Sequence, residues 1–371
     1  MSDEVKVPVD EPVPEWAVQY NAGDYPRQSV TGDAVALALD TAGPHCTVRA
    51  LLVERGGEPF RGLDAWPGGF MDWQDDADTR QAAIRELREE TGVEAPDFVE
   101  ALGSYSRNGR DPRQFAGYRD EKSGEWIARG ARVTTAAYLM LTHDPHGSAA
   151  PQGADDAAKA HWADVYAYLP WEDLRGDAGA RSHAAAALLA WAGEDAARQA
   201  RVHDLFGLAE WNEERTAERW ALLMEAGLVP EARRDRWGRA EPRERDAAFG
   251  REMAFDHREI LADALGRIRG KIKYTPAALM ALTGPEATLD ELQAACEAIA
   301  GRPLHRSNFR RAVAPSGRGK SRAPRIVART GRRRPRLGRG PGVAPEVYRF
   351  LPDAVRARLD TSIRFPWLPL A

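Results

Sequence analysis

The sequence predicts an α+β protein of more than one domain. Three observations support this: strand-like apolar runs around one amphipathic helix up to about residue 175, an Ala-, Glu- and Arg-rich middle with helical spacing, and an arginine-rich C-terminal segment. The 371 residues are enough for two or three domains and a sizeable hydrophobic core. A composition of 43% hydrophobic and 29% charged residues is typical of globular proteins.

The composition argues against several classes of protein. The longest uninterrupted apolar run, nine residues over Ala184–Ala192, is too short to span a bilayer. The first residues lack the apolar core of a signal peptide. Two cysteines, Cys46 and Cys296, cannot build a disulfide framework or a cysteine zinc site, and the eight histidines show no zinc-binding spacing. We therefore expect a cytoplasmic protein with no membrane partner.

Charge is distributed unevenly along the chain. Residues 301–371 carry 18 Lys and Arg against 3 Asp and Glu, whereas residues 1–300 carry 34 against 53. The overall net charge of −4 therefore combines +15 at the C-terminal end with −19 in the rest. A strongly basic end on an acidic body predicts that this end meets a polyanion.

The first predicted domain covers about residues 31–175. Before it, prolines and acidic residues in residues 1–30 predict a flexible arm. Helical spacing predicts one helix over residues 79–91. Apolar and β-branched runs predict strands at residues 35–39, 47–53 and 133–141.

The second half is predicted to be mainly helical. Residues 176–252 have the composition of a helical insert, and residues 253–352 form a further domain, followed by a tail over residues 353–371. Within residues 315–342, Arg, Gly, Pro and Ser dominate and predict a flexible loop. Other local signals are an apolar helical stripe from Ile260 to Ile268, a capping box of Thr288 and Glu291, a short helix from Pro303 through Arg311, and a returning strand at Val347–Phe350.

The helix over residues 79–91 is the most informative stretch. Glu86, Glu89 and Glu90 stand at i, i+3 and i+4, which places their carboxylates on one face. Such a cluster repels itself unless a cation neutralises it, and Mg²⁺ or Mn²⁺ prefers oxygen ligands. Arg85 lies four residues before Glu89 and can orient it. The alternative is an ordinary solvated acidic helix.

The stretch Gly68–Val93 resembles the Nudix box, Gly-x5-Glu-x7-Arg-Glu-U-x-Glu-Glu-x-Gly-U, where U is aliphatic. From Arg85 onward all seven fixed positions match. Counted from Gly69, the early acid falls on Asp75, and the loop is two residues longer than the motif. The resemblance implies a Nudix α/β/α sandwich. Arg85 and the three helix glutamates are then the catalytic set, and the glutamates bind the Mg²⁺ or Mn²⁺ that bridges a diphosphate during attack by water.

Two further segments resemble the branch of the Nudix family that handles ADP-ribose. Arginines beside the turn at residues 108–113 suit a diphosphate, because guanidinium forks match phosphate oxygens. Asp155 or Asp156 falls on the loop that, by the resemblance, offers a further metal ligand or general base. For each segment the alternative is an ordinary turn or charged loop. The expected ligand-binding residues are Gly68, Gly69, Arg110, Asp111 and Arg113.

A short polar and basic helix precedes the arginine-rich loop. Such a helix beside a basic hairpin is what a winged helix presents to double-stranded DNA: the helix enters the major groove and the hairpin follows the phosphates. The alternative is a disordered arginine-rich loop without a specific partner. The expected DNA-binding residues are Arg306, Asn308, Arg310, Arg311, Arg332, Arg333 and Arg334.

The order of segments after residue 253 resembles the C-terminal domain of the Nudix-related transcriptional regulators of NAD metabolism. The segments are Ala254–Leu265, Arg269–Pro276, Thr288–Gln293, Asn308–Arg311 and Tyr348–Phe350. The resemblance covers about residues 33–174 and 253–350 and implies a winged helix that binds double-stranded DNA. It also implies an effector such as ADP-ribose, whose binding releases the DNA, and a homodimer, because the operators are two-fold symmetric.

Two other functions stay open. The intact glutamate cluster favours a Mg²⁺-dependent hydrolase that cleaves ADP-ribose to AMP and ribose 5-phosphate and carries a basic nucleic-acid-binding domain. A regulator that keeps some hydrolysis is compatible with this. The other function is that of a Nudix enzyme whose basic arm binds RNA. It is less favoured because the helices before the arm have the order expected of a winged helix.

Overall fold

A mixed β-sheet lies at the centre of the structure. The computed structural model describes residues 21, 27–41, 45–143, 159–176, 178–207, 211–240, 246–314, 326–334, 344–356 and 367. The central strands are β1 (Ser29–Asp40), β2 (Thr47–Glu54), β8 (Val133–Thr142) and β5 (Phe98–Tyr105), in the order β2-β1-β8-β5. The strand β1 is antiparallel to β2 and parallel to β8. Of the other strands of this sheet, β3 (Asp64–Ala65) and β9 (Lys159–Asp164) pair with β2, and β4 (Gly68–Phe70) pairs with β1.

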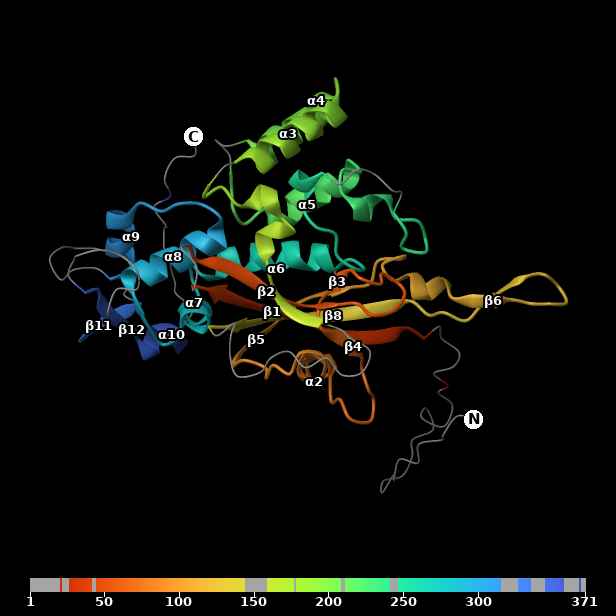
Figure 1. Cartoon of the computed structure of the whole chain (residues 1–371), viewed down its shortest axis with the longest axis horizontal. Coiled ribbons are helices and arrows are strands. Elements are labelled where there is room, and N and C mark those ends of the chain that lie inside the picture. The colour runs from red at the N-terminus through yellow and green to blue at the C-terminus, as the bar shows by residue number, and fades with distance from the viewer. Residues whose placement is uncertain are drawn as a thin grey trace.

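Helices cover the sheet on both faces (Figure 1). On one face lies α2 (Thr79–Thr91), which begins where the Asp78 side chain caps the amide of Gln81 and ends at Gly92 with φ 70°. It packs closely on β1 because Gly32 has no Cβ; a Cβ there would lie 2.4 Å from the Thr79 carbonyl oxygen. On the other face lies α6 (His257–Lys271).

The helices of the predicted insert share the core of the sheet. They are α3 (Gly179–Ala192), α4 (Ala196–Phe206) and α5 (Thr216–Glu225). Their buried residues, such as Leu188, Phe206 and Leu222, belong to one hydrophobic cluster that also includes Val35 of β1 and Phe309 near the C-terminal end. The described helices of residues 176–252 therefore build no separate core.

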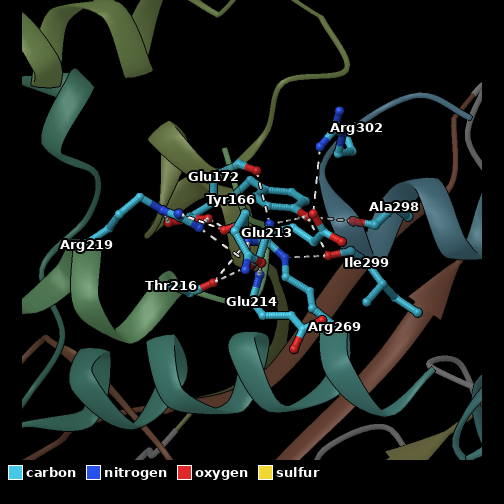
Figure 2. A network of polar contacts seen from close by, with 11 residues as sticks. Tyr166, Glu172, Glu213, Glu214, Thr216, Arg219, Arg269, Ala298, Ile299 and Arg302 are labelled. Carbon is cyan, nitrogen blue, oxygen red and sulfur yellow. Dashed lines mark hydrogen bonds and ion pairs between the residues drawn. The ribbon is translucent and has the colours of Figure 1, made fainter. Parts of the chain in front are cut away.

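A buried polar network joins three parts of the chain: the segment after the sheet that carries Glu172, the helix α5 and the helix α6 (Figure 2). Glu172 accepts hydrogen bonds from Arg219 of α5 at 2.6 and 2.8 Å and from Arg269 of α6 at 2.5 Å. All three side chains are fully buried. The Tyr166 hydroxyl donates to the Ala298 carbonyl oxygen at 2.6 Å, which extends the network to the helix over Leu289–Ala300. A buried charge needs such partners, so these contacts fix how the three parts meet.

The C-terminal part combines helices with a small antiparallel sheet. After α6 come α7 (Pro276–Thr283), β10 (Glu286–Thr288), α8 (Leu289–Ala300), α9 (Arg306–Val313), β11 (Val327–Arg333) and β12 (Glu346–Phe350). The three strands form an antiparallel sheet in the order β10-β12-β11. The capping box of Thr288 and Glu291 is confirmed at the start of α8. The chain continues into α10 (Pro352–Arg356).

Most predicted elements are confirmed, with three corrections. The strand β11 lies within residues 315–342, where a loop was predicted, because Ile326 and Val327 are buried and β11 pairs with β12. Ser29 and Val30 of the predicted arm belong to β1, and residues 1–20 and 22–26 lie outside the described residues. The helix predicted from Pro303 begins instead at Arg306.

The remaining elements are short. A hairpin of β6 (Gly117–Arg119) and β7 (Trp126–Ala128) projects from the body (Figure 1). The 3-10 helices are η2 (Pro112–Phe115), η3 (Val165–Ala167), η4 (Pro170–Glu172), η5 (Pro230–Arg233) and η6 (Ala247–Phe249). In the described part of the chain, every helix is too short or too polar to cross a membrane.

Candidate functional site

Arg85 is the hub of the box helix. Its Nη1 donates to Glu86 at 2.8 Å and to Glu89 at 3.0 Å, so the predicted pairing with Glu89 is confirmed. Its Nε and Nη2 donate to Asp76 at 3.2 and 2.9 Å, and Nη2 also donates to the Phe70 carbonyl oxygen at 3.0 Å. One guanidinium thus ties two carboxylates of α2 to the preceding loop.

The early acid of the box is Asp76, and the assignment to Asp75 is wrong. The Asp76 side chain is buried and accepts from the Asp72 amide at 2.8 Å as well as from Arg85, whereas Asp75 is exposed. The longer loop folds back on itself through the Asp72–Asp76 contact. This moves the acid that meets Arg85 one position along the chain.

The glycine turn at β4 lets two carboxylates approach the backbone. The Gly68 amide donates to Glu90 at 3.0 Å. A Cβ on Gly69 would lie 2.2 Å from a carboxylate oxygen of Glu86, and one on Gly68 would lie 2.4 Å from Oδ1 of Asp33. Side chains at these two positions would therefore displace the acids around them.

The carboxylates near this turn hold protons more tightly than usual. Burial raises the pKa of Glu90 to about 7, with a further contribution from Glu86 nearby. Burial also raises the pKa of Glu86, although Arg85 opposes the effect. A cation bound here would favour the ionised forms of both groups.

The three box glutamates are only partly brought together. Glu86 and Glu89 meet on Arg85, while Glu90 turns to Gly68. Within the described ranges, no three His, Cys, Asp or Glu side chains converge as metal ligands do. The chemistry of the donors nevertheless fits a hard divalent cation, because all are carboxylate oxygens and two have raised pKa values. The Mg²⁺ or Mn²⁺ site stays a prediction.

The three predicted residues at 110–113 have different environments. Arg110 is buried and bound by both oxygens of Asp256, at 2.8 and 2.6 Å. Asp111 caps η2 through the Arg113 amide at 2.9 Å and also binds the Arg113 side chain. Arg113 is the partly exposed member, and its guanidinium lies over the ring of Phe70 at 5.0 Å. Arg113 is therefore the best placed of the three to meet a ligand.

Four residues at this site were missed from the sequence. Asp33 is buried, its Oδ2 has no hydrogen-bond partner in the described structure, and burial raises its pKa to about 7. Oδ2 lies 3.7 Å from Nε2 of His257. Arg55 lies over the ring of Phe255 at 4.7 Å. An acid in an apolar strand and an arginine directly after a strand were available signals for Asp33 and Arg55. Phe255 and His257 lie in the segment Ala254–Leu265, whose resemblance pointed to the C-terminal domain and not to this site.

Asp155 and Asp156 lie outside the described residues. A cavity of about 250 Å³ adjoins Arg110. It is lined from the turn at residues 107–112, from α5 by Trp220 and Met224, and from α6 by Arg258 and Glu259, but not by the box glutamates. The described part of the insert thus forms one wall of a cavity beside the predicted ligand residues.

The predicted DNA-binding residues lie on α9 and β11, or directly after β11. On α9, Arg306 and Arg311 are exposed, whereas Asn308 and Arg310 are half-buried. Phe309 and Val313 of α9 are buried in the core, which fixes the helix with its basic side outward. On the strand side, Arg332, Arg333 and Arg334 are exposed.

Acidic side chains of the same chain hold most of these arginines. Asp290 of α8 accepts from Arg306 at 3.0 Å and from Arg310 at 2.8 Å. Arg334 pairs with Glu291 at 2.9 Å. Arg332 pairs with Glu286 and Arg311 with Asn308, while Arg333 donates to the Ala344 carbonyl oxygen at 2.8 Å. The basic surface is therefore partly neutralised from within.

Residues 32–189 are similar to a known domain family. A family model described as the NUDIX domain matches residues 32–189, which include the box and the sheet around it. The chain contains a Nudix domain. The match runs from β1 into α3, and the box helix α2 lies inside it.

Two curated relatives match parts of the chain. The "ADPR responsive transcriptional repressor NtrR" of Acinetobacter baylyi is 28% identical over 147 residues, which are 35% of this chain and 55% of that protein. The "ADP-ribose pyrophosphatase" of Methanocaldococcus jannaschii is 42% identical over 65 residues, 18% of this chain and 37% of that protein. The chain therefore matches about half the length of the first relative and about a third of the second.

A solved structure shares the wider fold around the Nudix domain. A MutT/nudix family protein from Enterococcus faecalis superposes with a TM-score of 0.51 at 21% identity and covers 91% of each chain. At this identity the likeness concerns the fold alone. It extends well beyond the Nudix domain, over most of this chain.

Proposed function

We propose that this protein is a ligand-responsive DNA-binding transcriptional regulator. Its Nudix domain would bind a nucleoside diphosphate such as ADP-ribose, and α9 with the β11–β12 hairpin would bind double-stranded DNA. One observation carries the proposal: a single hydrophobic core joins the Nudix sheet to a helix–strand–helix–helix–strand–strand unit whose outer helix bears arginines. The names of the two curated relatives, an ADPR-responsive repressor and an ADP-ribose pyrophosphatase, support the ligand class.

The basic surface fits a duplex better than a short anion. The arginines lie on two elements, α9 and the β11 side, and a DNA duplex offers many phosphates to which a helix and a hairpin can bind together. The homodimer expected from two-fold symmetric operators remains a prediction.

DNA binding with and without ADP-ribose tests the proposal directly. We expect the full-length protein to bind promoter DNA of NAD-biosynthesis genes at moderate salt and to release it when ADP-ribose is added. Arg310→Ala combined with Arg311→Ala should weaken binding and reduce its salt dependence, because phosphate contacts are lost. Absence of binding by the wild-type protein at low and moderate salt would reject the proposal.

Hydrolysis is the second candidate, favoured by the intact box. Glu86 and Glu89 are oriented by Arg85, and Asp76 in turn orients Arg85. Mg²⁺ or Mn²⁺ bound by Glu86, Glu89 and Glu90 would neutralise a diphosphate and activate water. Arg113, the partly exposed arginine of the turn at residues 107–113, would hold that diphosphate.

The test for hydrolysis compares wild type with Glu89→Gln. We expect AMP and ribose 5-phosphate from ADP-ribose and Mg²⁺ with the wild-type protein and a large loss with the variant. Product from neither protein would reject catalysis without touching DNA binding.

A further inference from the structure

A short segment of the C-terminal part reaches into the Nudix site. The Ala254 amide donates to the Asp64 carbonyl oxygen at 2.9 Å. Three residues on, Nδ1 of His257 accepts from the Trp66 amide at 2.9 Å, and the His257 carbonyl oxygen accepts from the Trp66 indole at 3.0 Å. These bonds fasten residues 254–257 to the strand that leads into the glycine turn. Phe255 and Asp256 are thereby held inside the site.

The ring of Phe255 carries two guanidinium groups. Arg55 lies 4.7 Å and Arg113 lies 5.4 Å from the ring centroid. Each cation is attracted to the ring face, although the two cations repel each other. Phe255 has φ 51°, a conformation that a bulky side chain rarely adopts, so the surrounding contacts must hold it.

Asp256 holds a third guanidinium. Its two oxygens bind Nε and Nη2 of Arg110 at 2.8 and 2.6 Å, and both side chains are almost fully buried. Arg110 belongs to the same turn as Arg113, so the ion pair between Arg110 and Asp256 holds that turn in place. Two consecutive residues therefore contact Arg55, Arg113 and the turn that carries Arg113, and they act together with Asp111, which binds the Arg113 side chain.

The placement of these arginines suits a diphosphate. Arg55 and Arg113 share one aromatic ring, and Arg113 is partly exposed. Burial and the charge of Arg113 lower the pKa of Arg55, and an anion with two or more charges that binds both guanidinium groups would relieve their repulsion. Such an anion would also change how strongly both groups attract the Phe255 ring.

We propose that Phe255 and Asp256 are positioning residues for a diphosphate site formed by Arg55 and Arg113, and that they pass its occupancy to α6. The inference rests on the proposed function and adds the route between ligand and DNA. Asp256 is the cap residue of α6, and Arg269 of that helix enters the buried network with Glu172. A shift at residues 255–256 therefore acts on a helix that packs against the DNA-binding part.

The first test measures anion affinity by calorimetry, with inorganic pyrophosphate and with ADP-ribose as probes. Phe255→Leu and Phe255→Met remove the ring, whereas Phe255→Tyr keeps it. Loss of two cation–π contacts predicts about 5- to 30-fold weaker binding for the first two variants and rescue by the third. Phe249→Leu is the matched control, because Phe249 is equally buried but carries neither arginine. Equal affinity of all four variants and wild type for pyrophosphate would overturn the inference.

The second test measures coupling, as the ratio of DNA affinities without and with saturating ADP-ribose. We expect this ratio to fall toward one in Phe255→Leu and to stay at the wild-type value in Phe249→Leu. A wild-type ratio in Phe255→Leu would overturn the route through Phe255. A wild-type protein that binds pyrophosphate but does not respond to ADP-ribose would instead overturn the proposed function, and the affinity series would still decide the role of Phe255.

Discussion

Single residues around Arg85 decide how the box acids are presented. Asp76 and Asp75 are neighbours of identical chemistry, yet one is buried against Arg85 and the other is exposed. The difference arises from the loop, which turns back so that the Asp72 amide meets Asp76. Geometry at this scale depends on backbone direction and is invisible in the residue type.

Replacement of Asp76 should disturb the site, whereas replacement of Asp75 should not. Asp76→Asn removes the charge that fixes two nitrogens of Arg85 and leaves that guanidinium poorly paired. We expect a loss of about 1.5–3 kcal/mol in the free energy of unfolding, the range for hydrogen bonds to charged groups, and weaker Mg²⁺ binding. Chemical denaturation and Mg²⁺ titration measure both. Asp75→Asn is the matched control, and equal effects of the two variants would refute the assignment of Asp76.

Glu90 gives a prediction about pH. Burial raises the pKa of its carboxyl from 4.5 to about 7, so between these values the folded protein holds a proton that the unfolded chain has released. Stability from this group is therefore present below pH 4.5 and lost as the pH rises through about 7. In EDTA, Glu90→Gln should raise the Tm above neutral pH and leave it nearly unchanged near pH 4.5.

The control for Glu90 removes the same charge from an exposed site. Glu94→Gln lies just beyond the end of α2 and should change the Tm little at either pH. Added Mg²⁺ should raise the Tm of the wild-type protein more than that of Glu90→Gln. If the Tm of Glu90→Gln in EDTA above neutral pH were below that of the wild-type protein, this would contradict the raised pKa of Glu90.

At the scale of elements, an acidic side chain of α8 neutralises part of the positive charge of α9. Asp290 lies at the start of α8 and binds Arg306 and Arg310, two of the four predicted DNA-binding residues on α9. An acid in this place competes with DNA phosphates for the same guanidinium groups. It should weaken binding to arbitrary sequence more than binding to a site where base contacts add to the affinity.

Asp290→Asn should therefore raise non-specific DNA affinity. Freeing two arginines for phosphate contacts should steepen the salt dependence, with a slope of log K against log salt larger by about 1–2. Fluorescence anisotropy on a duplex without the operator, over a salt series, measures this. Asp353→Asn on α10 removes the same charge from a residue that forms no ion pair within the described residues, and should have a smaller effect. An unchanged slope in Asp290→Asn would contradict the prediction.

The elements that the sequence predicted best are those with local signals. The helix α2 was predicted at its observed bounds because helical spacing is a local signal, and the structure adds the Asp78 cap at its start. Glu89 and Arg85 could be paired because helical spacing fixes their separation. By contrast, Arg110 and Asp256 are 146 residues apart, and only the packing of α6 on the sheet brings them together. Contacts of this kind, including those of Phe255, leave no periodic or spacing signal.

At the scale of the whole molecule, the network around Glu172 joins three parts. Burial alone raises the pKa of Glu172, but Arg219 and Arg269 outweigh it and hold the pKa below its ordinary value. Stability from this group is therefore present above pH 4.5, the ordinary value, and lost as the pH falls below it. The carboxylate is the common acceptor of two buried guanidinium groups (Figure 2).

Glu172→Gln should destabilise the whole chain. Two buried guanidinium groups would lose their counter-charge, for which about 3–5 kcal/mol of unfolding free energy is typical. Glu225→Gln, which breaks the exposed pair with Arg201, should cost at most about 1 kcal/mol. Urea unfolding at neutral pH measures both, and the difference between wild type and Glu172→Gln should shrink in acid. Equal costs for the two variants would show that the network is not a structural junction.

The shared core has a consequence for taking the protein apart. The helix α6 covers one face of the Nudix sheet and also leads into the arginine-bearing unit. Separating the Nudix sheet from that unit would therefore expose buried apolar surface on both fragments. Neither fragment should then keep the structure that it has in the intact chain. A fusion of the arginine-bearing unit to another ligand-binding domain would have to include α6 and the part of the sheet that α6 contacts. Hydrogen exchange should accordingly report α6 and the central strands as one cooperative unit.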